Sequence, residues 1–590
     1  MFKQTMCGIF GFVTNKQHQA TEILEGLKTL EYRGYDSWGV AVKSGESINF
    51  QKNIGKIGDA KINLGETKIG IGHTRWATHG GVTVKNAHPH LDCKKQIALI
   101  HNGIIENYQS LKEDLIKKGH KFISETDTEV AVHLIEEFNK TKDFSNSVRL
   151  AFNKFEGMNA IVVMSAVSSE IVAAKSGSPL IIGKAKDGFY LSSDLSAMNS
   201  SSEFLFLKDN EMVILGKTLK LLSVKSGKTL SPVFEKIPWK VSLESKGSFE
   251  HFMLKEIFEE PKVIRNIEKN YPDNVSKLSK LIEGAYGTFL IGSGTAYFAC
   301  LAGSYLFSKI AKKHVNTLPA SEFNYLEDFL TKKSLIIALS QSGETIDVVE
   351  PLQRAKEKGS KIAALTNVIG STIYRMADKK FLLLAGPEKA VASTKAYIAK
   401  LSILLMVSYA LKKNLTKAQK ILEKTALEIE KILSKDSLAR LKRFSEKLSK
   451  HENIYILGRG LSYASSLEAA LKIKEVSYIH AEGLAGGELK HGPIALISKG
   501  TPCIVFAPND ETYSAIISNA AEIKARGGYI IGISFEENSV FDEFIKIEDN
   551  LEGSYIAQIV PVQILAYYLA LKKGYDPDKP RNLAKSVTVK

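Results

Sequence analysis

A cysteine lies close to the start of the chain, in the segment Met6-Cys7-Gly8. A cysteine that follows an initiator methionine can become the first residue. Its free α-amino group, with a pKa of about 7.7–8.0, can then take the proton of the thiol. A lone early cysteine is more often a small buried hydrophobe. Five residues, Met1 to Thr5, precede Met6, so the free-amine mechanism predicts that the active protein begins at Cys7.

Three later segments carry groups that amide hydrolysis needs. Arg75 has a planar guanidinium that can hold a substrate carboxylate through two hydrogen bonds. Asn102 and Gly103 offer an amide side chain and a backbone N–H, the parts of an oxyanion hole. Asp127 lies where a helix is expected to begin and could hold an ammonium group. Two alternatives remain open at this point: Asp127 could be a helix N-cap, and Asn102-Gly103 a hairpin turn.

Five histidines in the same region raise the question of a metal. They stand at His73, His79, His88, His90 and His101. Their spacing fits no common zinc pattern, and no cysteine pair accompanies them. We therefore expect core or loop histidines here, and neither a metal site nor a cofactor.

Hydroxyl-rich turns in the second half of the chain are suited to a phosphate. The segment Ser340-Gln341-Ser342-Gly343-Glu344-Thr345 follows an apolar strand and opens a helix, where hydroxyls and free N–H groups bind anions. Ser293-Gly294-Thr295 offers a second such turn. Each turn alone could be only a helix cap. Two turns after neighbouring strands favour a phosphate site.

Charged residues further on have types that suit sugar isomerisation. Glu468, Lys472 and Glu475 have helical spacing and share one face, which could also be a solvated salt-bridge face. His491 follows in a loop, and histidine and glutamate suit ring opening and proton transfer between C1 and C2. Lys585 lies near the chain end, where a desolvated lysine could form a Schiff base with a ketose carbonyl.

Two kinds of secondary structure must position these groups. The first 235 or so residues show short strands between turn residues, and two amphipathic helices. The expected strands are Gly39–Val42, Ile69–His73, Ile97–His101, Ala160–Met164 and Ile171–Ala174, and the expected helices are Thr21–Glu31 and Glu129–Asn139. A polar segment with Pro238 and Gly247, from Phe234 to Gly247, is expected to be a linker.

After the linker, a strand–loop–helix pattern occurs twice. The matching strands are Thr288–Gly294 with Asn453–Gly460, Ser334–Leu339 with Pro502–Ala507, and Lys361–Thr366 with Gly528–Ser534. The repeat predicts two parallel α/β units, about Glu250–Leu411 and Lys431–Leu571, with helices on both faces of each sheet. Ligands of such sheets bind beyond the carboxyl ends of the strands, where the two hydroxyl-rich turns fall.

Bulk properties exclude several classes. The chain has 590 residues, a net charge of +15, four cysteines, 44% hydrophobic and 24% charged residues. Its lysines are scattered and no nucleic-acid motif appears, so we expect anionic substrates and not nucleic acid. No segment suggests a membrane span, since the apolar run Ile398–Leu411 contains Lys400 and is expected to be a buried helix. Four cysteines in so long a chain indicate a reduced cytosol.

The first half resembles the glutaminase domain of the N-terminal-nucleophile amidotransferases. The resemblance rests on the Cys7, Arg75, Asn102-Gly103 and Asp127 segments and on Leu30 to Ser37, which is similar to a loop that folds over glutamine in the hexosephosphate branch. It implies that Cys7 is the nucleophile, that Asn102 and Gly103 form the oxyanion hole, and that Arg75 and Asp127 hold glutamine. Further glutamine-binding residues would be Trp76, which would also gate ammonia, Thr78 and His79. Trp38 replaces a residue that is usually small in this family.

The second half resembles the sugar-isomerase half of the isomerising glutamine–fructose-6-phosphate aminotransferases, and with the first half the resemblance covers the whole chain. It implies that Glu475 moves the proton, that His491 from the other subunit of a dimer opens the ring, that Lys585 meets the ketose C2 and that Lys472 assists. The implied sugar-phosphate ligands are Thr295, Ser340, Gln341, Ser342, Thr345 and, at a sugar-contacting strand end, Val391 and Ser393. Ser293 and Ala296 replace a frequent cysteine and a frequent serine.

This resemblance implies a multidomain α/β and α+β protein. Its parts would be a layered α/β/β/α glutaminase at 7–235, a linker at 236–249, two doubly wound sugar-isomerase units at 250–425 and 426–575, and a catalytic tail at 576–590. The implied reaction transfers the amide nitrogen of L-glutamine to D-fructose 6-phosphate in a cytoplasmic homodimer. Three alternatives are a phosphoribosyl amidotransferase, which would need a diphosphate loop that is missing from the sequence, a sugar-phosphate sensor and a deglycase.

Overall fold

The chain forms two compact units. The computed structural model describes residues 7–31, 34–77, 79–198, 200–236 and 245–587. The first unit extends to Ser245 and includes the chain end from Ser586, and the second unit is Lys246–Lys585. Residues 1–6 and most of the expected linker, 237–244, lie outside the described residues.

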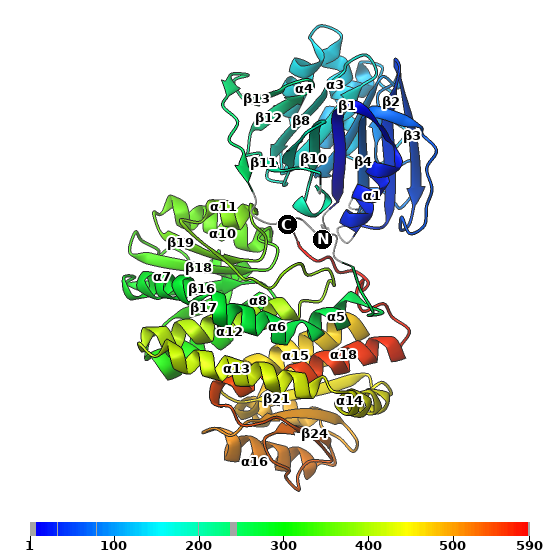
Figure 1. Ribbon diagram of the computed structural model, residues 1–590. Coiled ribbons are helices and arrows are strands. Elements are labelled where there is room, and N and C mark those ends of the chain that lie inside the picture. Colours follow the sequence, from blue (N-terminus) through cyan, green and yellow to red (C-terminus); the bar gives the residue numbers. More distant parts are fainter. Residues whose placement is uncertain (1–6, 32–33, 78, 199, 237–244, 588–590) are drawn as a thin grey trace. The chain divides into compact units, whose positions relative to one another are not determined.

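Two antiparallel sheets make up the centre of the first unit (Figure 1). The larger has the order β15-β11-β9-β10-β1-β4-β2-β3, with β1 Gly8–Gln19, β2 Ser37–Ser44, β3 Ser47–Ile54, β4 Glu66–Arg75, β9 Ile181–Ala185, β10 Gly188–Ser192, β11 Glu203–Phe206 and β15 Glu235–Lys236. The other has the order β14-β13-β12-β8-β7-β6-β5, with β5 His90–Leu91, β6 Ile97–Gly103, β7 Asn159–Ser165, β8 Ile171–Ser176, β12 Glu211–Leu215, β13 Leu219–Ser223 and β14 Thr229–Leu230.

The first unit has four layers, because each sheet is covered on its outer face by helices. Side chains of both sheets, such as Ile71 and Val162, form one core between them. Helix α1 (Thr21–Leu30) packs on β1 and β4, whereas α3 (Thr128–Asn139) and α4 (Phe144–Phe152) pack on β6 and β8. Both faces of the sheets are therefore buried, which explains the unbroken apolar runs in β1 and β7. The expected α/β/β/α architecture is confirmed.

Two parallel sheets form the second unit. The first has the order β17-β16-β18-β19-β20, with β16 Gly287–Gly292, β17 Asn316–Pro319, β18 Ser334–Ser340, β19 Lys361–Thr366 and β20 Lys379–Leu382. The second has the order β22-β21-β23-β24-β25, with β21 Asn453–Gly458, β22 His480–Ala485, β23 Pro502–Ala507, β24 Tyr529–Ser534 and β25 Glu543–Lys546. The two sheets share the same topology, so the predicted repeat is confirmed.

Several helices lie between these two sheets (Figure 1). They are α6 Glu260–Asn270, α8 Thr295–Leu306, α12 Lys395–Leu411, α13 Leu415–Ile432, α15 Leu461–Ser477 and α18 Val560–Lys572. Helix α15 contacts both α8 and α18, and α12 contacts α8 and α6. One continuous core therefore joins the two halves of the second unit. The run expected to be a buried helix is confirmed as α12, whose charged Lys400 is buried with it.

One segment of the described residues is long and apolar enough to cross a membrane. It is Leu551–Lys572, and 89% of its most apolar window is buried inside the fold. A helix that is apolar on all sides and covered by protein on all sides is typical of a core helix.

Trp38 is expected to contribute strongly to the stability of the first unit. It lies on β2, is 2% exposed and belongs to the core between the larger sheet and α1. We expect Trp38→Ala to lower the free energy of unfolding by about 3–5 kcal/mol, because it removes a large buried side chain and leaves a cavity. Calorimetry of the full chain measures this as a lower midpoint of thermal unfolding. Trp38→Phe, the matched control, should lose clearly less, and an equal loss in both variants would contradict a packing role.

Candidate active sites

Cys7 immediately precedes β1 and is half-buried beside Trp76. The backbone N–H of Trp76 donates to the Cys7 sulfur at 3.4 Å, and the Trp76 carbonyl lies 3.8 Å from the same sulfur. Desolvation raises the pKa of the Cys7 thiol to about 11, although the Trp76 N–H and the charge of Arg75 act to lower it. The side chain is thus a thiol at neutral pH, and it needs an adjacent base to become a nucleophile.

Asn102 is held against Cys7 by a histidine. Its Nδ2 donates to the Cys7 carbonyl at 2.9 Å, and its Oδ1 lies 3.1 Å from His73 Nε2. The same Nε2 lies 2.9 Å from the carbonyl of His101. Burial lowers the pKa of His73 to about 3, so the ring is neutral. Because both neighbours of Nε2 are acceptor oxygens, this nitrogen carries the proton and fixes the Asn102 amide with its NH₂ toward Cys7.

Gly103 occupies a position that no other residue fits. Its φ is +137°, and a Cβ added there would lie 2.0 Å from the carbonyl oxygen of Met158. Asn102 and Gly103 are the last residues of β6, paired with Ala160 and Asn159 of β7. The alternative that they form a hairpin turn is therefore wrong.

Arg75 and Asp127 lie close enough to Cys7 for their charges to act on its pKa. Arg75 is buried at the end of β4 and donates to the carbonyls of His79 and Gly81, at 2.5 and 3.3 Å. Asp127 Oδ2 accepts from the backbone N–H of Ile105 at 2.8 Å. Asp127 is the N-cap residue of α3, as the capping alternative predicted, but its side chain makes no capping hydrogen bond to that helix. The structure thus gathers these charges around Cys7.

The other expected glutamine ligands lie beside this group of residues or outside the described residues. Trp76 makes an edge contact with Tyr35, with ring centroids 5.1 Å apart, and His79 makes one with Tyr108 at 5.5 Å. Thr78 lies outside the described residues, as do residues 32 and 33 of the expected glutamine loop.

The loop before Asp127 is fixed by a carboxylate that the sequence analysis did not single out. Glu129, in the first turn of α3, accepts from the backbone N–H groups of Ile123 and Ser124 at 2.9 and 2.7 Å. Burial acts to raise the pKa of Glu129, but hydrogen bonds from His133 and Ser124 outweigh it and bring the pKa to about 2. The carboxylate is therefore ionised and holds residues 123–124 against the helix.

A buried charge cluster lies at the centre of the second unit. Lys472 Nζ on α15 lies 2.5 Å from Glu475 Oε2 and 3.5 Å from Glu468 Oε1. Thr295, the first residue of α8, accepts from Lys472 at 3.1 Å and donates to Glu468 at 3.2 Å. The side chains of Glu468 and Lys472 have no exposed surface. The predicted common face is confirmed, and the alternative of a solvated salt-bridge face is wrong.

Burial and mutual charge interactions shift the pKa values of Glu468 and Lys472 from those of exposed groups. Burial raises the pKa of Glu468 to about 7, and the charge of Lys472 opposes that shift. Burial acts to lower the pKa of Lys472, but Glu468 and Glu475 outweigh it, so the pKa of Lys472 is raised. The cluster therefore keeps a lysine cation in the interior between two carboxyl groups.

The two hydroxyl-rich turns follow adjacent strands, as predicted. Ser293-Gly294 connects β16 to α8, and 341–345 connects β18 to α10 (Ile346–Glu357). The Ser340 hydroxyl accepts from the Gly343 N–H at 2.9 Å and lies 3.4 Å from the Thr345 hydroxyl. Gly343 has a φ of +68°, and a Cβ there would lie 2.0 Å from Ser371 Oγ.

Hydroxyls of Ser342 and Thr345 are thus gathered with the half-exposed Gln341 at the start of α10. Thr345 is the N-cap residue of that helix, yet its side chain makes no capping hydrogen bond. Its hydroxyl instead lies beside that of Ser340 at the helix N-terminus, where anions are favoured.

Lys585 is docked in the second unit by a partner that the sequence analysis missed. Its Nζ lies 2.6 Å from Glu388 Oε2, and the two side chains are 5% and 0% exposed. Ser393 donates to the same oxygen at 3.0 Å. Burial acts to raise the pKa of Glu388, but Lys585 outweighs it and brings the pKa to about 2. An acidic residue three positions before Val391 was the available signal.

One expectation for the neighbours of the tail is wrong. Val391 and Ser393 do not end a strand; they lie in the loop before α12, where the Val391 N–H donates to the Asp578 carbonyl at 3.0 Å. In the tail itself, Arg581 stacks on the Tyr478 ring with its guanidinium carbon 4.2 Å from the centroid, and Val587 is 40% exposed.

The Lys585 pair and the Lys472 cluster act on each other electrostatically. The charge of Glu388 contributes to raising the pKa of Lys472. Buried Lys400 is influenced by both groups: burial lowers its pKa to about 8, opposed by Glu388 and Glu468. The structure therefore brings these predicted residues into one charged interior.

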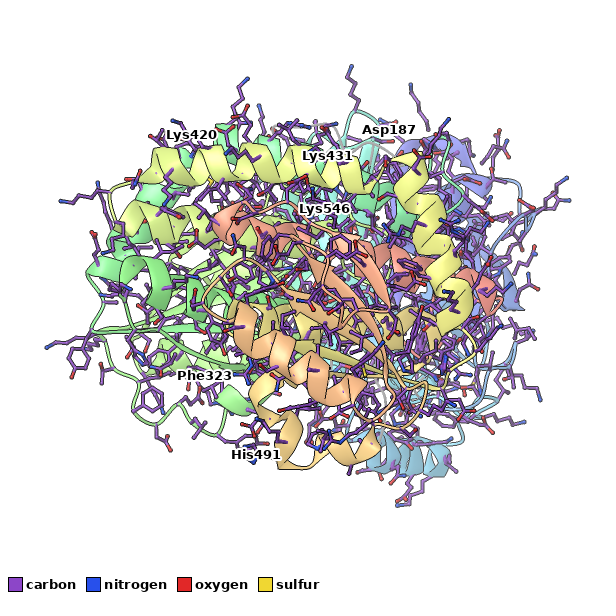
Figure 2. The ribbon with its side chains drawn as sticks, turned by 90° about the horizontal axis from the view of Figure 1, so that it is seen from below. Asp187, Phe323, Lys420, Lys431, His491 and Lys546 are labelled. Carbon is purple, nitrogen blue, oxygen red and sulfur yellow. The ribbon has the colours of Figure 1, made fainter. Side chains whose placement is uncertain are left out.

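His491 does not join this interior. It ends the 3-10 turn Gly486–His491, is exposed, and lies at the edge of the molecule in the view of Figure 2. Within the described ranges, no hydrogen bond or ion pair links it to Lys472, Glu475 or Lys585.

Comparisons with known proteins agree with this two-part architecture. The family model of the glutamine amidotransferase domain matches residues 49–238, and that of the SIS domain matches residues 282–409 and 447–572. Fold and matched families define a two-part amidotransferase, with a glutaminase followed by paired sugar-isomerase domains. The chain is 41% identical to the glutamine–fructose-6-phosphate aminotransferase [isomerizing] of Thermococcus kodakarensis, and 42% identical to that of Clostridium tetani. Each alignment covers 99% of this chain and 100% of the relative. The chain belongs to the family of isomerising glutamine–fructose-6-phosphate aminotransferases.

Solved structures match the second unit. One is the C-terminal domain of glucosamine-fructose-6-phosphate aminotransferase from Francisella tularensis, 33% identical, with a TM-score of 0.54 over 57% of this chain and all of that one. The fold is shared with a tagatose-6-phosphate ketose/aldose isomerase described as putative, from Clostridium novyi, which is 19% identical with a TM-score of 0.51 over 57% of this chain and 93% of that one.

The raised pKa of Glu468 predicts a pH-dependent stability. Folded Glu468 keeps its proton up to about pH 7, whereas the ordinary value is 4.5. Between these values the folded state binds more protons than the unfolded state, so the free energy of unfolding falls as pH rises. Glu468→Gln cannot titrate, and its midpoint of thermal unfolding should fall less than that of the unchanged protein between about pH 5 and pH 7. Parallel midpoint curves for the two proteins would show that Glu468 does not titrate in this range.

Proposed function

We propose that this chain transfers the amide nitrogen of L-glutamine to D-fructose 6-phosphate, giving D-glucosamine 6-phosphate and L-glutamate. The observation that carries the proposal is the presence on one chain of a Cys7–Asn102 pair in the first unit and a buried Lys472–Glu475 pair in the second. The first set suits amide hydrolysis and the second suits proton transfer on a sugar phosphate. The names of the full-length relatives support the same pair of substrates.

In the glutaminase half, Cys7 Sγ attacks the side-chain carbonyl carbon of glutamine. The thiol proton passes to a base, for which the free α-amine of Cys7 is the candidate, and returns to the departing ammonia. Asn102 has two N–H donors, and only one is directed to the Cys7 carbonyl. We assign the other donor, together with the Gly103 N–H, to the oxyanion. Water then hydrolyses the thioester to glutamate.

Binding of the amino acid itself falls to two charged residues of the same unit. Arg75 and Asp127 are the candidates for glutamine's carboxylate and ammonium, since each has a charge that acts on Cys7. Trp76, Thr78 and His79 complete the proposed glutamine site.

In the isomerase half, the phosphate is assigned to the hydroxyls of Thr295, Ser340, Ser342 and Thr345 and to Gln341, with Val391 and Ser393 on the sugar. Lys585 Nζ, once it has given up a proton, attacks C2 of the ketose, and water leaves to form an imine. Ammonia then displaces the lysine amine. Glu475 takes the proton from C1 and returns it to C2, which moves the carbonyl to C1 and leaves the amine on C2. Lys472, 2.5 Å from Glu475, stabilises the carboxylate form that takes the proton from C1.

The exposure of His491 supports a homodimer. A ring-opening histidine that does not approach Glu475 within its own chain can act if a second copy supplies it, so we assign it to the partner's site. We further propose a cytoplasmic protein with no nucleic-acid or membrane partner, divided into a glutaminase at 7–235, a linker at 236–249, sugar-isomerase units at 250–425 and 426–575, and a tail at 576–590.

Product analysis with glutamine and fructose 6-phosphate tests the proposal through two variants. Cys7→Ala should abolish glutamate formation, because it removes the proposed nucleophile, but retain ketose–aldose isomerisation of the sugar phosphate. Glu475→Gln should show the reverse, with isomerisation reduced by about 100-fold or more, as is typical for loss of a general base. Unchanged isomerisation in folded Glu475→Gln would return this residue to a structural ion pair. Absence of glucosamine 6-phosphate with the unchanged protein would reject the function.

Lys585 is expected to act as a nucleophile and not only as a cation. Lys585→Arg keeps a charge beside Glu388 but cannot form an imine, so synthesis should be lost as severely as in Lys585→Met. Borohydride trapping of fructose 6-phosphate, followed by peptide mapping, should label Lys585 in the unchanged protein alone. Substantial synthesis by the Arg variant, or a label on another lysine, would contradict the assignment.

A further inference from the structure

Four potential metal ligands meet in the first unit, apart from the residues assigned to glutamine. They are Cys93, His120, His133 and Glu136, and their ligand atoms all lie within 4.8 Å of one another. Cys93 comes from the turn between β5 and β6, and His120 from the segment after α2 (Tyr108–Lys117). His133 and Glu136 lie one turn apart on α3. Three separate segments thus converge on one point.

The distances within this cluster approach those of a tetrahedral site. Cys93 Sγ lies 3.6 Å from His133 Nδ1 and 3.9 Å from His120 Nδ1. Glu136 Oε2 lies 3.0 Å from His120 Nδ1 and 3.1 Å from His133 Nδ1. Zinc bound at about 2.0–2.3 Å to nitrogen, oxygen and sulfur places neighbouring ligand atoms roughly 3.3–3.8 Å apart. Shifts of a few tenths of an ångström would therefore give a closed four-coordinate site.

The outer nitrogens of both histidines face carboxylates. His120 Nε2 lies 3.0 Å from Glu137 Oε2, within hydrogen-bond distance, whereas His133 Nε2 lies 3.7 Å from Glu129 Oε1, just beyond it. Carboxylates that accept the outer N–H of a ligating imidazole fix its tautomer and its orientation. Here each outer nitrogen faces a carboxylate, while each Nδ1 faces the common centre.

Without a cation, Nδ1 of either ring can donate to Glu136 Oε2, which lies 3.0 Å from His120 Nδ1 and 3.1 Å from His133 Nδ1. The outer nitrogens then face Glu137 and Glu129. This metal-free network of histidines and glutamates is the alternative that a metal test must distinguish from zinc binding.

We propose that Cys93, His120, His133 and Glu136 bind one Zn²⁺ ion as a closed structural site. One thiolate, two imidazoles and one carboxylate are donors that suit zinc and do not suit Mg²⁺ or Ca²⁺. The exposure of Cys93 leaves a path for the ion to enter. The site would tie the β5–β6 turn and the segment after α2 to α3, the helix that begins directly after Asp127.

The test measures metal bound to the full chain, produced without a histidine tag and passed through gel filtration after addition of ZnCl₂. Elemental analysis should find about one zinc per chain in the unchanged protein, as the single four-ligand site requires. Cys93→Ala and His133→Ala should lose it. Cys503→Ala and His314→Ala replace a cysteine and a histidine outside the cluster and should keep it.

Cobalt and an outer-shell variant provide two further readouts. CoCl₂ added to metal-free protein should give the d–d absorption of tetrahedral Co²⁺ and a thiolate charge-transfer band that is absent in Cys93→Ala. Glu137→Gln, which changes the outer partner of His120 and none of the four ligands, should weaken zinc affinity by about 10–100-fold.

Each outcome decides for or against the site. The proposal is wrong if the unchanged protein binds no more zinc than Cys93→Ala, or if its cobalt spectrum lacks the thiolate band. The cluster would then be an ion-pair network of histidines and glutamates without metal. Zinc that survives both ligand substitutions would place the metal elsewhere.

Discussion

Lys472 is a charged side chain with no exposed surface at the centre of the second unit. The need to neutralise this buried charge determines which groups surround it. An unpaired charge there would be expelled or neutralised. Lys472 is held by Glu468 and Glu475 on α15 and by the Thr295 hydroxyl on α8. These contacts therefore constrain the relative position of the two helices. Removing one partner of a buried pair costs about 3–5 kcal/mol. The same ion pairs that link the helices leave Lys472 and Glu468 without exposed surface and Glu475 20% exposed. Shielding from water strengthens the electrostatic interactions among these groups.

In the first unit, the buried polar side chains near Cys7 include several neutral histidines. His73, His88 and His90 are buried, and desolvation lowers the pKa of each, so they form hydrogen bonds without adding charge near Cys7. His73 stacks on His88, with ring centroids 4.0 Å apart, and orients the Asn102 amide. The histidine-rich composition of this region thus has a structural cause. Neutral imidazoles leave Arg75, Asp36 and Asp127 as the charges that act on the pKa of the Cys7 thiol.

The sequence alone predicted those parts of the molecule that depend on local pattern. Glu468, Lys472 and Glu475 were placed on one face because helical spacing is a property of a single segment, and the repeated strand–turn–helix pattern predicted both parallel sheets. Partners that come from distant segments were missed. Glu388 contacts Lys585 across 197 positions, and Cys93 meets His133 across 40. No local rule links such pairs. The stack of Arg581 on Tyr478 was missed for the same reason, since an arginine near a chain end does not show which group it will contact.

Contacts with distant segments also order the end of the chain, where the side chain of Lys585 is buried. Chain ends usually fray because few contacts repay the entropy of ordering them. In this tail, the order comes from two kinds of contact on either side of Leu583. The Arg581 backbone N–H donates to the Tyr478 hydroxyl at 2.6 Å, and Lys585 pairs with Glu388 inside the fold. Tyr478 directly follows α15, the helix that carries Lys472 and Glu475. The Arg581 contact therefore ties the tail to the end of α15, the helix that carries Glu475, the proposed proton-transfer residue. Lys585 and Glu475 lie 110 positions apart in the sequence.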